Sequence, residues 1–164
     1  MDHLWSPWRY RYIQSAKPTD ACLFCSKAAA NGDEDHYIVH RAKFNFVILN
    51  LYPYTTGHLM IAPYEHVANL ETADPAGLQE MILLARAAEK NLAGIYKPEG
   101  FNIGMNIAEC AGAGVASHIH MHVLPRWKGD ANFVSTIGET RVMPEELPAT
   151  WKKLTAAFAA HSLS

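Results

Sequence analysis

The sequence predicts an α+β fold, in which an antiparallel five-stranded sheet carries one long helix across it and a second helix follows near the carboxyl end. Three observations lead to this prediction. Short runs rich in β-branched and aromatic residues are bounded by turn residues, as is typical of strands. Residues 74–94 repeat apolar side chains at helical spacing, and residues 148–161 show a second, shorter repeat. No internal repeat divides the chain, so we expect one domain.

The first three predicted strands cover residues 36–40, 43–50 and 58–62. The second is the clearest, because it combines aromatic and β-branched residues. The segment 52–57 between the second and the third has the composition of a turn. We therefore expect these three strands to form an antiparallel meander.

The last two strands are expected at residues 101–107 and 118–124, joined by a loop rich in Gly and Ala at residues 108–117. Pro125 cannot donate a hydrogen bond within a sheet, so the fifth strand is predicted to end there.

The long helix is expected to begin at Asp74 and Pro75, because Asp is a favoured N-cap and Pro is favoured at the first helical position. Gly94 is its expected end. The second helix, over residues 148–161, should bury Trp151, Leu154 and Phe158. The side of the long helix that faces the sheet is predicted to carry residues that are apolar except for Glu89, namely Leu78, Met81, Ile82, Ala85, Ala88, Glu89 and Leu92.

The composition limits the classes of function. With 164 residues, of which 49% are hydrophobic, the chain can bury a substantial core. A net charge of −2 without a basic run argues against electrostatic binding to nucleic acid or to a membrane surface, although a small anionic ligand held by local donors remains possible. No run reaches membrane-spanning length, and residues 1–12 lack the apolar stretch of a signal peptide. A cytoplasmic protein is expected.

The most informative segment contains His118, His120 and His122, which alternate with apolar residues. In an extended strand these three imidazoles lie on one face, while Ile119, Met121 and Val123 face the other side. A purely structural explanation would need a buried polar partner for each of three core imidazoles. A chemical role for the row is therefore favoured.

Cys22 and Cys25 form a Cys-x-x-Cys pair, and Cys110 is the only other cysteine. Three cysteines do not make a secreted disulfide framework. In a reducing compartment the pair is typical of metal ligation or redox chemistry.

The His-x-His-x-His pattern, followed by two apolar residues and preceded by a Gly-rich loop, resembles the histidine triad (HIT) family of nucleotide hydrolases and transferases. Further matching positions are Asn50, Pro53, Gly57 to Met60, Pro63 to His66 and Pro125 to Trp127. More narrowly, Trp8-Arg9 and the segments 49–54, 100–102 and 129–133 resemble bacterial diadenosine tetraphosphate phosphorylases. The resemblance implies a HIT-like fold and one HIT domain over residues 1–164, with an amino-terminal arm (1–20), a core (21–140) and a carboxyl-terminal helix and tail (141–164).

The resemblance also implies catalytic roles. The middle histidine of the family attacks the α-phosphorus of a nucleotide, and His120 occupies that position. Neutral imidazole is nucleophilic without prior ionisation, in agreement with this role. Its other nitrogen then needs a fixed acceptor, for which we expect a backbone carbonyl. His122 is implied to contact the phosphate or to protonate the leaving oxygen, and His58 is implied to lie near the triad.

Nucleotide-binding roles are implied as well, each with a structural alternative. Asn50 matches the ribose-binding residue of the family, although Asn also caps turns. Phe46, Ile48 and Leu51 become candidates for the base pocket, with core packing as the alternative. The phosphate-binding loop would comprise Asn106, Gly112, Gly114 and Val115. Its glycines would let backbone amides reach phosphate oxygens, but many family members have Ser or Thr where this chain has Val115.

Relatives in the superfamily bind structural zinc at positions that match Cys22, Cys25, His66 and His118, a soft four-ligand set that suits zinc. The alternative is a reduced dithiol without metal. Four cations are candidates for binding the distal phosphates of a long polyphosphate chain, with a solvated surface position as the alternative for each: Arg9, Arg11, Arg126 and Lys128. No organic cofactor is expected, and the resemblance implies at least a homodimer.

Together these features predict an enzyme that cleaves dinucleoside polyphosphates, such as diadenosine tetraphosphate, through a nucleotidyl-histidine that phosphate or water captures. The alternatives are a nucleoside phosphoramidate hydrolase, a nucleotide-binding scaffold with incidental turnover, and a metallohydrolase that uses all three histidines of the triad as ligands.

Overall fold

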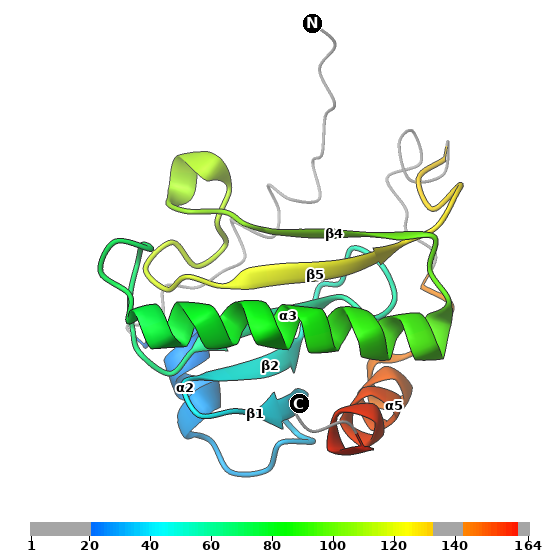
Figure 1. Cartoon of the computed structure of the whole chain (residues 1–164), viewed down its shortest axis with the longest axis horizontal. Helices are drawn as coiled ribbons and strands as arrows, with labels where there is room; N and C mark the ends of the chain where they lie inside the picture. Colours follow the sequence, from blue (N-terminus) through cyan, green and yellow to red (C-terminus); the bar gives the residue numbers. More distant parts are fainter. Residues whose placement is uncertain (1–20, 133–142, 161–164) are drawn as a thin grey trace, which may run out of the picture.

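A computed structural model describes residues 21–132 and 143–160. Its centre is a five-stranded antiparallel sheet with the strand order β1-β2-β3-β5-β4 (Figure 1). The first three strands are consecutive in the chain and adjacent in the sheet, which confirms the predicted meander. The strands are β1 (Ile38–Arg41), β2 (Asn45–Leu49), β3 (Leu59–Pro63), β4 (Gly100–Met105) and β5 (Met121–Arg126).

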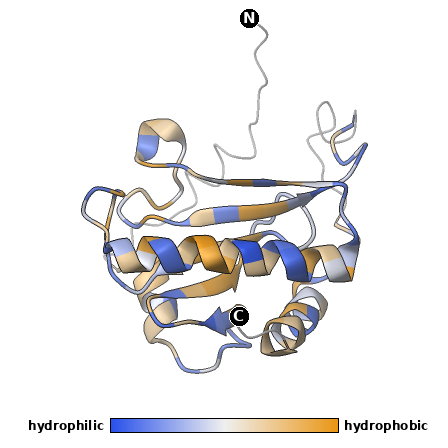
Figure 2. Cartoon of the chain, in the orientation of Figure 1, coloured by the Kyte–Doolittle hydropathy of each residue, from blue (hydrophilic) through white to orange (hydrophobic). Residues whose placement is uncertain are grey.

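Helix α3 (Pro75–Tyr96) lies across one face of the sheet, as predicted (Figure 1). Asp74 caps its amino end, since the carboxylate accepts a hydrogen bond from the Ala76 amide at 3.0 Å. Figure 2 shows hydrophilic and hydrophobic bands alternating along the helix. The buried core between helix and sheet consists of Val39, Val47, Leu49, Leu59, Ile61, Met81, Leu84, Ala85, Ala88, Leu92, Met121 and Val123, with two residues of the last helix.

Two predictions about α3 are wrong. The helix does not stop at Gly94, because Ile95 and Tyr96 continue it and pack against the core; Lys97, with a φ of +47°, ends it. Ile82, which is 59% exposed, and Glu89, which is also exposed, do not face the sheet. The apolar repeat is wider than the buried stripe, so spacing alone did not separate Ile82 from its buried neighbours.

Helix α5 (Leu147–Ala160) packs against β1 and α3 (Figure 1). Leu154 and Phe158 are buried as predicted, and Trp151 is half-buried. The Trp151 indole donates a hydrogen bond to the Ile38 carbonyl at 2.8 Å, which ties the helix to the edge strand.

The opposite face of the sheet is covered by a short helix, α2 (Leu23–Ala29), which the sequence did not predict. It contributes Phe24 to a second buried cluster, while Val115 and Tyr64 pack at the margin of that cluster. This second cluster consists of Phe24, Ile38, Phe46, Ile48, Met60 and Ala62. No helix in the described parts of the chain is long and apolar enough to cross a membrane.

The fifth strand also differs from its predicted limits. It begins at Met121, because the His118 and Ile119 amides donate to carbonyls outside the β5 ladders, those of Val115 and Val67. It also runs through Pro125 to Arg126 instead of ending at Pro125. The register with β3 reaches only Val123, so Pro125 pairs on the β4 side alone, where the strand tolerates proline.

Candidate functional site

The three triad histidines lie on the α2 face of the sheet, as strand alternation predicts. The His122 position is paired with Met60 of the second cluster, and the rings of His118 and His120 both contact Phe24. His118 and His120 are buried, whereas His122 is half-buried. The face opposite to α3 therefore carries the imidazoles.

The tautomer of His118 follows from its hydrogen bonds. Its Nε2 lies 2.9 Å from the Pro63 carbonyl oxygen, which can only accept, so Nε2 carries the proton. The other nitrogen, Nδ1, faces the sulfurs of Cys22 at 3.3 Å and Cys25 at 3.6 Å. Burial lowers the pKa of His118, which favours the neutral ring. His118 thus presents a lone pair to the two cysteines.

The expected backbone acceptor for His120 is the carbonyl of His118, which accepts a hydrogen bond from Nδ1 at 2.9 Å. Because Nδ1 carries the proton, Nε2 carries the lone pair. Burial lowers the pKa of His120, and the bond to the carbonyl opposes this effect in part. The Phe24 ring lies 4.8 Å from the His120 ring and 1% of its surface is exposed, so it packs firmly against the imidazole.

His122 is linked to His58, which the resemblance placed near the triad. The Tyr54 amide donates to His58 Nδ1 at 3.1 Å, so this nitrogen has no proton. His58 Nε2 therefore donates to His122 Nδ1, at 2.9 Å. The Tyr54 ring packs on both imidazoles, with its centroid 4.8 Å from His58 and 6.2 Å from His122. In the neutral pair, His122 then carries its proton on Nε2.

Gly57 allows His58 to lie here. Its φ of +78° is in the left-handed region, and a Cβ at this position would lie 2.8 Å from Leu92 Cδ2 and 3.3 Å from the Tyr96 ring. Both features favour glycine at this position. The turn between β2 and β3 can therefore close tightly against α3 and present the next residue to the triad.

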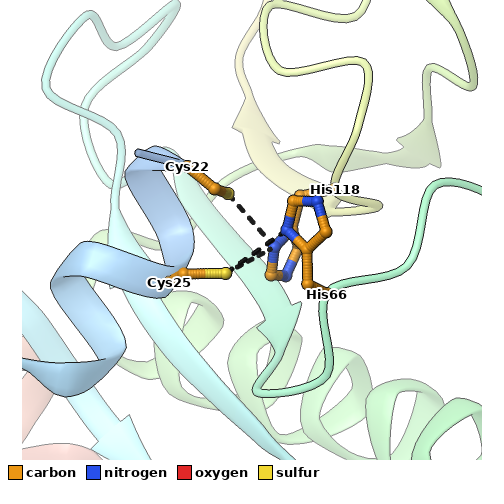
Figure 3. A group of neighbouring side chains, drawn as sticks. All are labelled: Cys22, Cys25, His66 and His118. Carbon is orange, nitrogen blue, oxygen red and sulfur yellow. Dashed lines mark hydrogen bonds between the residues drawn. The ribbon is translucent and has the colours of Figure 1, made fainter. Parts of the chain in front are cut away.

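Cys22, Cys25, His66 and His118 form the one cluster of potential metal ligands found in the described residues. Figure 3 shows the two cysteines on and beside α2 and the two imidazoles opposite them. Their ligand atoms all lie within 4.8 Å of one another, and Cys25 Sγ is 3.3 Å from His66 Nδ1. Burial raises the pKa of the Cys25 thiol, and the neighbouring Cys22 raises it further. The three triad histidines do not form such a cluster together, which argues against the three-histidine metallohydrolase.

The loop before the triad is partly closed on itself. The Gly112 amide donates to the Glu109 carbonyl at 2.8 Å, so the structure does not aim that predicted phosphate donor outward. Asn106 donates to the Gly112 carbonyl at 3.5 Å and so lies within the same loop. Gly114 is exposed, and Val115 packs at the edge of the second cluster. Contacts of this loop with phosphate remain a prediction.

The residues proposed to bind the base and the sugar differ in their exposure and in their position in the fold. Phe46 and Ile48 are fully buried in the second cluster, whereas Leu51 is 40% exposed. Asn50 follows β2 and closes a turn, because its Oδ1 accepts from the Tyr52 amide at 2.9 Å. Its Nδ2 lies 3.4 Å from His58 Nδ1. Binding of a nucleotide by these residues remains a prediction.

Arg126 is not a free phosphate-binding cation. Its guanidinium makes two hydrogen bonds to the Asp130 carboxylate, at 2.6 and 2.8 Å, and a third to Asn102 Oδ1. Lys128 is almost fully exposed and lies 3.5 Å from Glu99. Arg9 and Arg11 lie outside the described residues.

A cavity of about 320 Å³ lies on the other side of the histidine strand. It is bounded by the start of α3, the start of β2 and the end of β3. Ile119 is the residue of the His118–His122 segment that lines it. Because no histidine lines it, it is separate from the imidazole site.

Sequence reasoning missed two contributors to the site, Phe24 and the Tyr54 amide. Phe24 stands between Cys22 and Cys25, so a cluster that joins these cysteines to His118 brings α2 close to the triad. The ring of Phe24 is buried and contacts the imidazoles, whereas Leu23, also between the cysteines, is exposed. The amide of Tyr54 left no signal, because backbone donors are not visible in side-chain patterns.

Comparison with known proteins identifies the family. The family model described as the HIT domain matches residues 31–129, more than half of the chain. The chain is 36% identical to "AP-4-A phosphorylase" of Mycobacterium tuberculosis, over 97% of this chain and 85% of that protein. It is also 28% identical to the asymmetrical bis(5'-nucleosyl)-tetraphosphatase of Schizosaccharomyces pombe, over 57% of this chain and 50% of that protein.

Among solved structures, a zinc-bound histidine triad family protein from Mycobacterium smegmatis superposes with a TM-score of 0.70 at 25% identity, covering 86% of this chain and 95% of that one. The predicted α+β fold is thus confirmed. With its row of histidines on the α2 face of this sheet and with the match over residues 31–129, the chain belongs to the histidine triad family.

Proposed function

We propose that the protein is an enzyme that cleaves dinucleoside polyphosphates, with diadenosine tetraphosphate as substrate and phosphate as the acceptor of the nucleotidyl group. The observation that carries the proposal is the fixed tautomer of His120, whose Nδ1 donates to the His118 carbonyl and whose Nε2 therefore holds a lone pair. The similarity to an AP-4-A phosphorylase over nearly the whole chain supports the choice of substrate.

The first step is attack of His120 Nε2 on the α-phosphorus. A nitrogen–phosphorus bond forms, the bond from phosphorus to the bridging oxygen breaks, and ATP leaves with the electron pair of that bond. The ring keeps its Nδ1 proton, and the carbonyl of His118 stabilises the positive charge that develops on the imidazole. The product of this step is an adenylyl-His120.

His122 is placed to assist departure of the leaving group. Its Nδ1 accepts from His58, so the neutral ring holds a proton on Nε2 that it can donate in a hydrogen bond to a phosphate oxygen. The His120 and His122 rings lie with their centroids 5.0 Å apart and nearly perpendicular to each other. One phosphoryl group can therefore meet the nucleophile and the donor at once.

In the second step an oxygen of phosphate attacks the same phosphorus, the nitrogen–phosphorus bond breaks, and ADP forms. Water in place of phosphate would give AMP. Hydrolysis is the second candidate, because Arg126 is engaged by Asp130 and does not offer a vacant site for an anion, and because one relative is a tetraphosphatase. The similarity to the phosphorylase over 97% of the chain favours phosphate.

Incubation of the enzyme with diadenosine tetraphosphate, with and without millimolar phosphate, tests the proposal. Separation of the nucleotides should show ATP and ADP when phosphate is present, and slow formation of ATP and AMP without it. ATP and AMP under both conditions, at a rate independent of phosphate, would reject the phosphorylase and leave a hydrolase. No cleavage at all would favour a phosphoramidate hydrolase or a nucleotide-binding scaffold. An assay with an adenosine phosphoramidate would then distinguish the two, because only the hydrolase would turn it over.

Zinc is the metal that the Cys22, Cys25, His66 and His118 cluster fits. In a tetrahedral site, zinc–sulfur bonds of about 2.3 Å and zinc–nitrogen bonds of about 2.0 Å hold a sulfur and a nitrogen roughly 3.5 Å apart. The sulfur–nitrogen distances of 3.3 to 3.6 Å are close to this spacing. The His118 nitrogen that faces the cysteines is the unprotonated one, as ligation requires. Bound zinc would supply structural rigidity here.

A homodimer is the expected assembly, and β4 is the strand that supports it. β4 forms one edge of the sheet and pairs only with β5 in the described structure, while 44% of Ile103 on it is exposed. An exposed apolar edge strand is a template for pairing with another chain. Light scattering during size-exclusion chromatography should give twice the chain mass of 18.2 kDa. For the Ile103→Lys variant, the measured mass should fall towards that of the monomer.

A further inference from the structure

The side chain of Asn50 connects the sugar-binding position expected from the family to the His58–His122 pair. Its orientation is fixed without ambiguity. Oδ1 faces the Tyr52 amide at 2.9 Å, and an amide N–H can only donate, so the facing atom must be the oxygen. Nδ2 then lies on the other side of the group, 3.4 Å from His58 Nδ1.

Two donors from the described residues therefore approach His58 Nδ1. The Tyr54 amide is 3.1 Å away and the Asn50 amide 3.4 Å away. A protonated Nδ1 would direct its own N–H at both. Because His58 is fully buried, solvent does not relieve such a conflict. The two donors together hold the proton of His58 on Nε2.

The position of this proton decides the state of His122. His58 Nε2 donates to His122 Nδ1 at 2.9 Å, and the neutral His122 ring must then carry its proton on Nε2. If His58 held its proton on Nδ1 instead, His122 would have to donate from Nδ1 and would present a lone pair at Nε2. A lone pair directed at a phosphate oxygen repels it, whereas an N–H attracts it.

We propose that Asn50 is a positioning residue for His122, in addition to any contact that it makes with the sugar. It acts through His58, by keeping the acceptor nitrogen of that ring unprotonated. This inference rests on the proposed function, since the benefit of an N–H at His122 is the stabilisation of a phosphate oxygen. It also gives a reason for an amide at position 50, because only the amide supplies both an acceptor for the turn and a donor for His58.

The Asn50→Asp variant separates the two roles. A carboxylate keeps an acceptor for the Tyr52 amide and for a sugar hydroxyl, but it places an acceptor against His58 Nδ1 in place of a donor. His58 should then take up a second proton, because a carboxylate in contact stabilises imidazolium. Within the described parts of the chain, the titratable side chains whose rings contact the His58 ring are Tyr54, from the same turn, and His122, from β5.

Nitrogen NMR of ¹⁵N-histidine-labelled protein without substrate reads the protonation of each ring nitrogen, and a His58→Gln variant assigns the His58 signals. In the wild type we expect His58 and His122 to be protonated on Nε2 and not on Nδ1 at neutral pH. In Asn50→Asp the titration midpoint of His58 should rise by about one pH unit or more, with a matching shift in the pH profile of kcat/KM. KM should change by less than about threefold, because the acceptor for the sugar is retained.

Asn69→Asp is the matched control. Asn69 also closes a turn by accepting from a backbone amide, that of Thr72, but it lies on the loop between β3 and α3. The Asn69→Asp substitution adds the same charge as Asn50→Asp and should leave the titration midpoint of His58 unchanged. A wild-type His58 with its proton on Nδ1, or an Asn50→Asp variant whose His58 midpoint does not rise above that of the control, would overturn the inference. Failure of the proposed reaction would instead appear as an inactive wild type with these tautomers intact.

Discussion

The carbonyl oxygen of His118 accepts a hydrogen bond from Nδ1 of His120 at 2.9 Å, while the ring of His118 faces the two cysteines of the metal-ligand cluster. One residue therefore belongs to both sites. Its ring is held by Pro63 and the sulfurs, and its main chain orients the neighbouring imidazole. Any change that moves His118 moves the acceptor on which the His120 tautomer depends.

This shared residue leads to a prediction about metal. Protein purified without chelator should contain about one zinc per chain. Removal of the zinc should lower Tm more than it directly reduces the rate of the reaction, because metal binding adds to the free energy of folding. Elemental analysis and thermal unfolding measure both. Cys25→Ser should lose the metal, whereas Cys110→Ser, which changes an exposed cysteine outside the cluster, should keep it. Metal-free protein that takes up no added zinc would favour the dithiol.

Gly57→Ala should destabilise the protein by about 1–3 kcal/mol, because the added Cβ meets Leu92 at 2.8 Å and the φ of +78° disfavours alanine. Gly94→Ala is a matched control inside α3, where a Cβ would meet nothing within 4 Å. That change should be neutral or should stabilise by up to about 1 kcal/mol. Urea unfolding compares the two, and equal effects would contradict the steric account of the turn before His58.

The Asp130 carboxylate should stabilise the fold above pH 4 and lose that effect in acid. Two hydrogen bonds from Arg126 are the main reason that the pKa of Asp130 falls from 3.8 to about 2. A group whose pKa is lower in the folded state contributes stability above its unfolded pKa, and this contribution disappears as the pH falls through the folded value.

The Asp130→Asn variant checks this effect. Its Tm should lie below that of the wild type at pH 6, and the gap should narrow between pH 4 and pH 2. Because the Arg126 side chain is 41% exposed, the expected difference is only about 0.2–1 kcal/mol. A gap that is constant over this pH range would show that the ion pair does not titrate as proposed.

The sequence predicted the sheet and the two larger helices because their patterns are local. The aromatic and β-branched run of β2, the alternation in β5 and the apolar repeat of α3 are each visible within one short segment. Element limits were less accurate, since tertiary contacts decide them. Tyr96 continues α3 beyond Gly94 because it packs on the core, and His118 leaves the ladder because its amide bonds within the preceding loop. Helix α2 is only seven residues long, which is too short for a periodic signal.

At the site, the residue types were predictable but their protonation was not. The pattern His118, His120 and His122 indicated a row of imidazoles, and the resemblance added His58 and His66. The nitrogen that carries each proton depends on backbone groups, namely the carbonyls of Pro63 and His118 and the amide of Tyr54. Such groups exist at every residue, so only the fold shows which of them meet a ring.

The last prediction concerns the nucleophile itself. His120→Asn removes the only nitrogen in the proposed reaction that bonds to phosphorus, so cleavage of diadenosine tetraphosphate should fall by at least about a thousandfold. Mass spectrometry after a rapid quench should detect an adenylyl group on the wild type and none on the variant. His40→Gln serves as a control, because this half-buried histidine stacks on Phe158, away from the triad, and its loss should leave turnover within about threefold. Thermal unfolding must show that both variants remain folded at the assay temperature. A folded His120→Asn enzyme with a rate within tenfold of the wild type, or an adenylyl group on another residue, would exclude His120 as the covalent nucleophile.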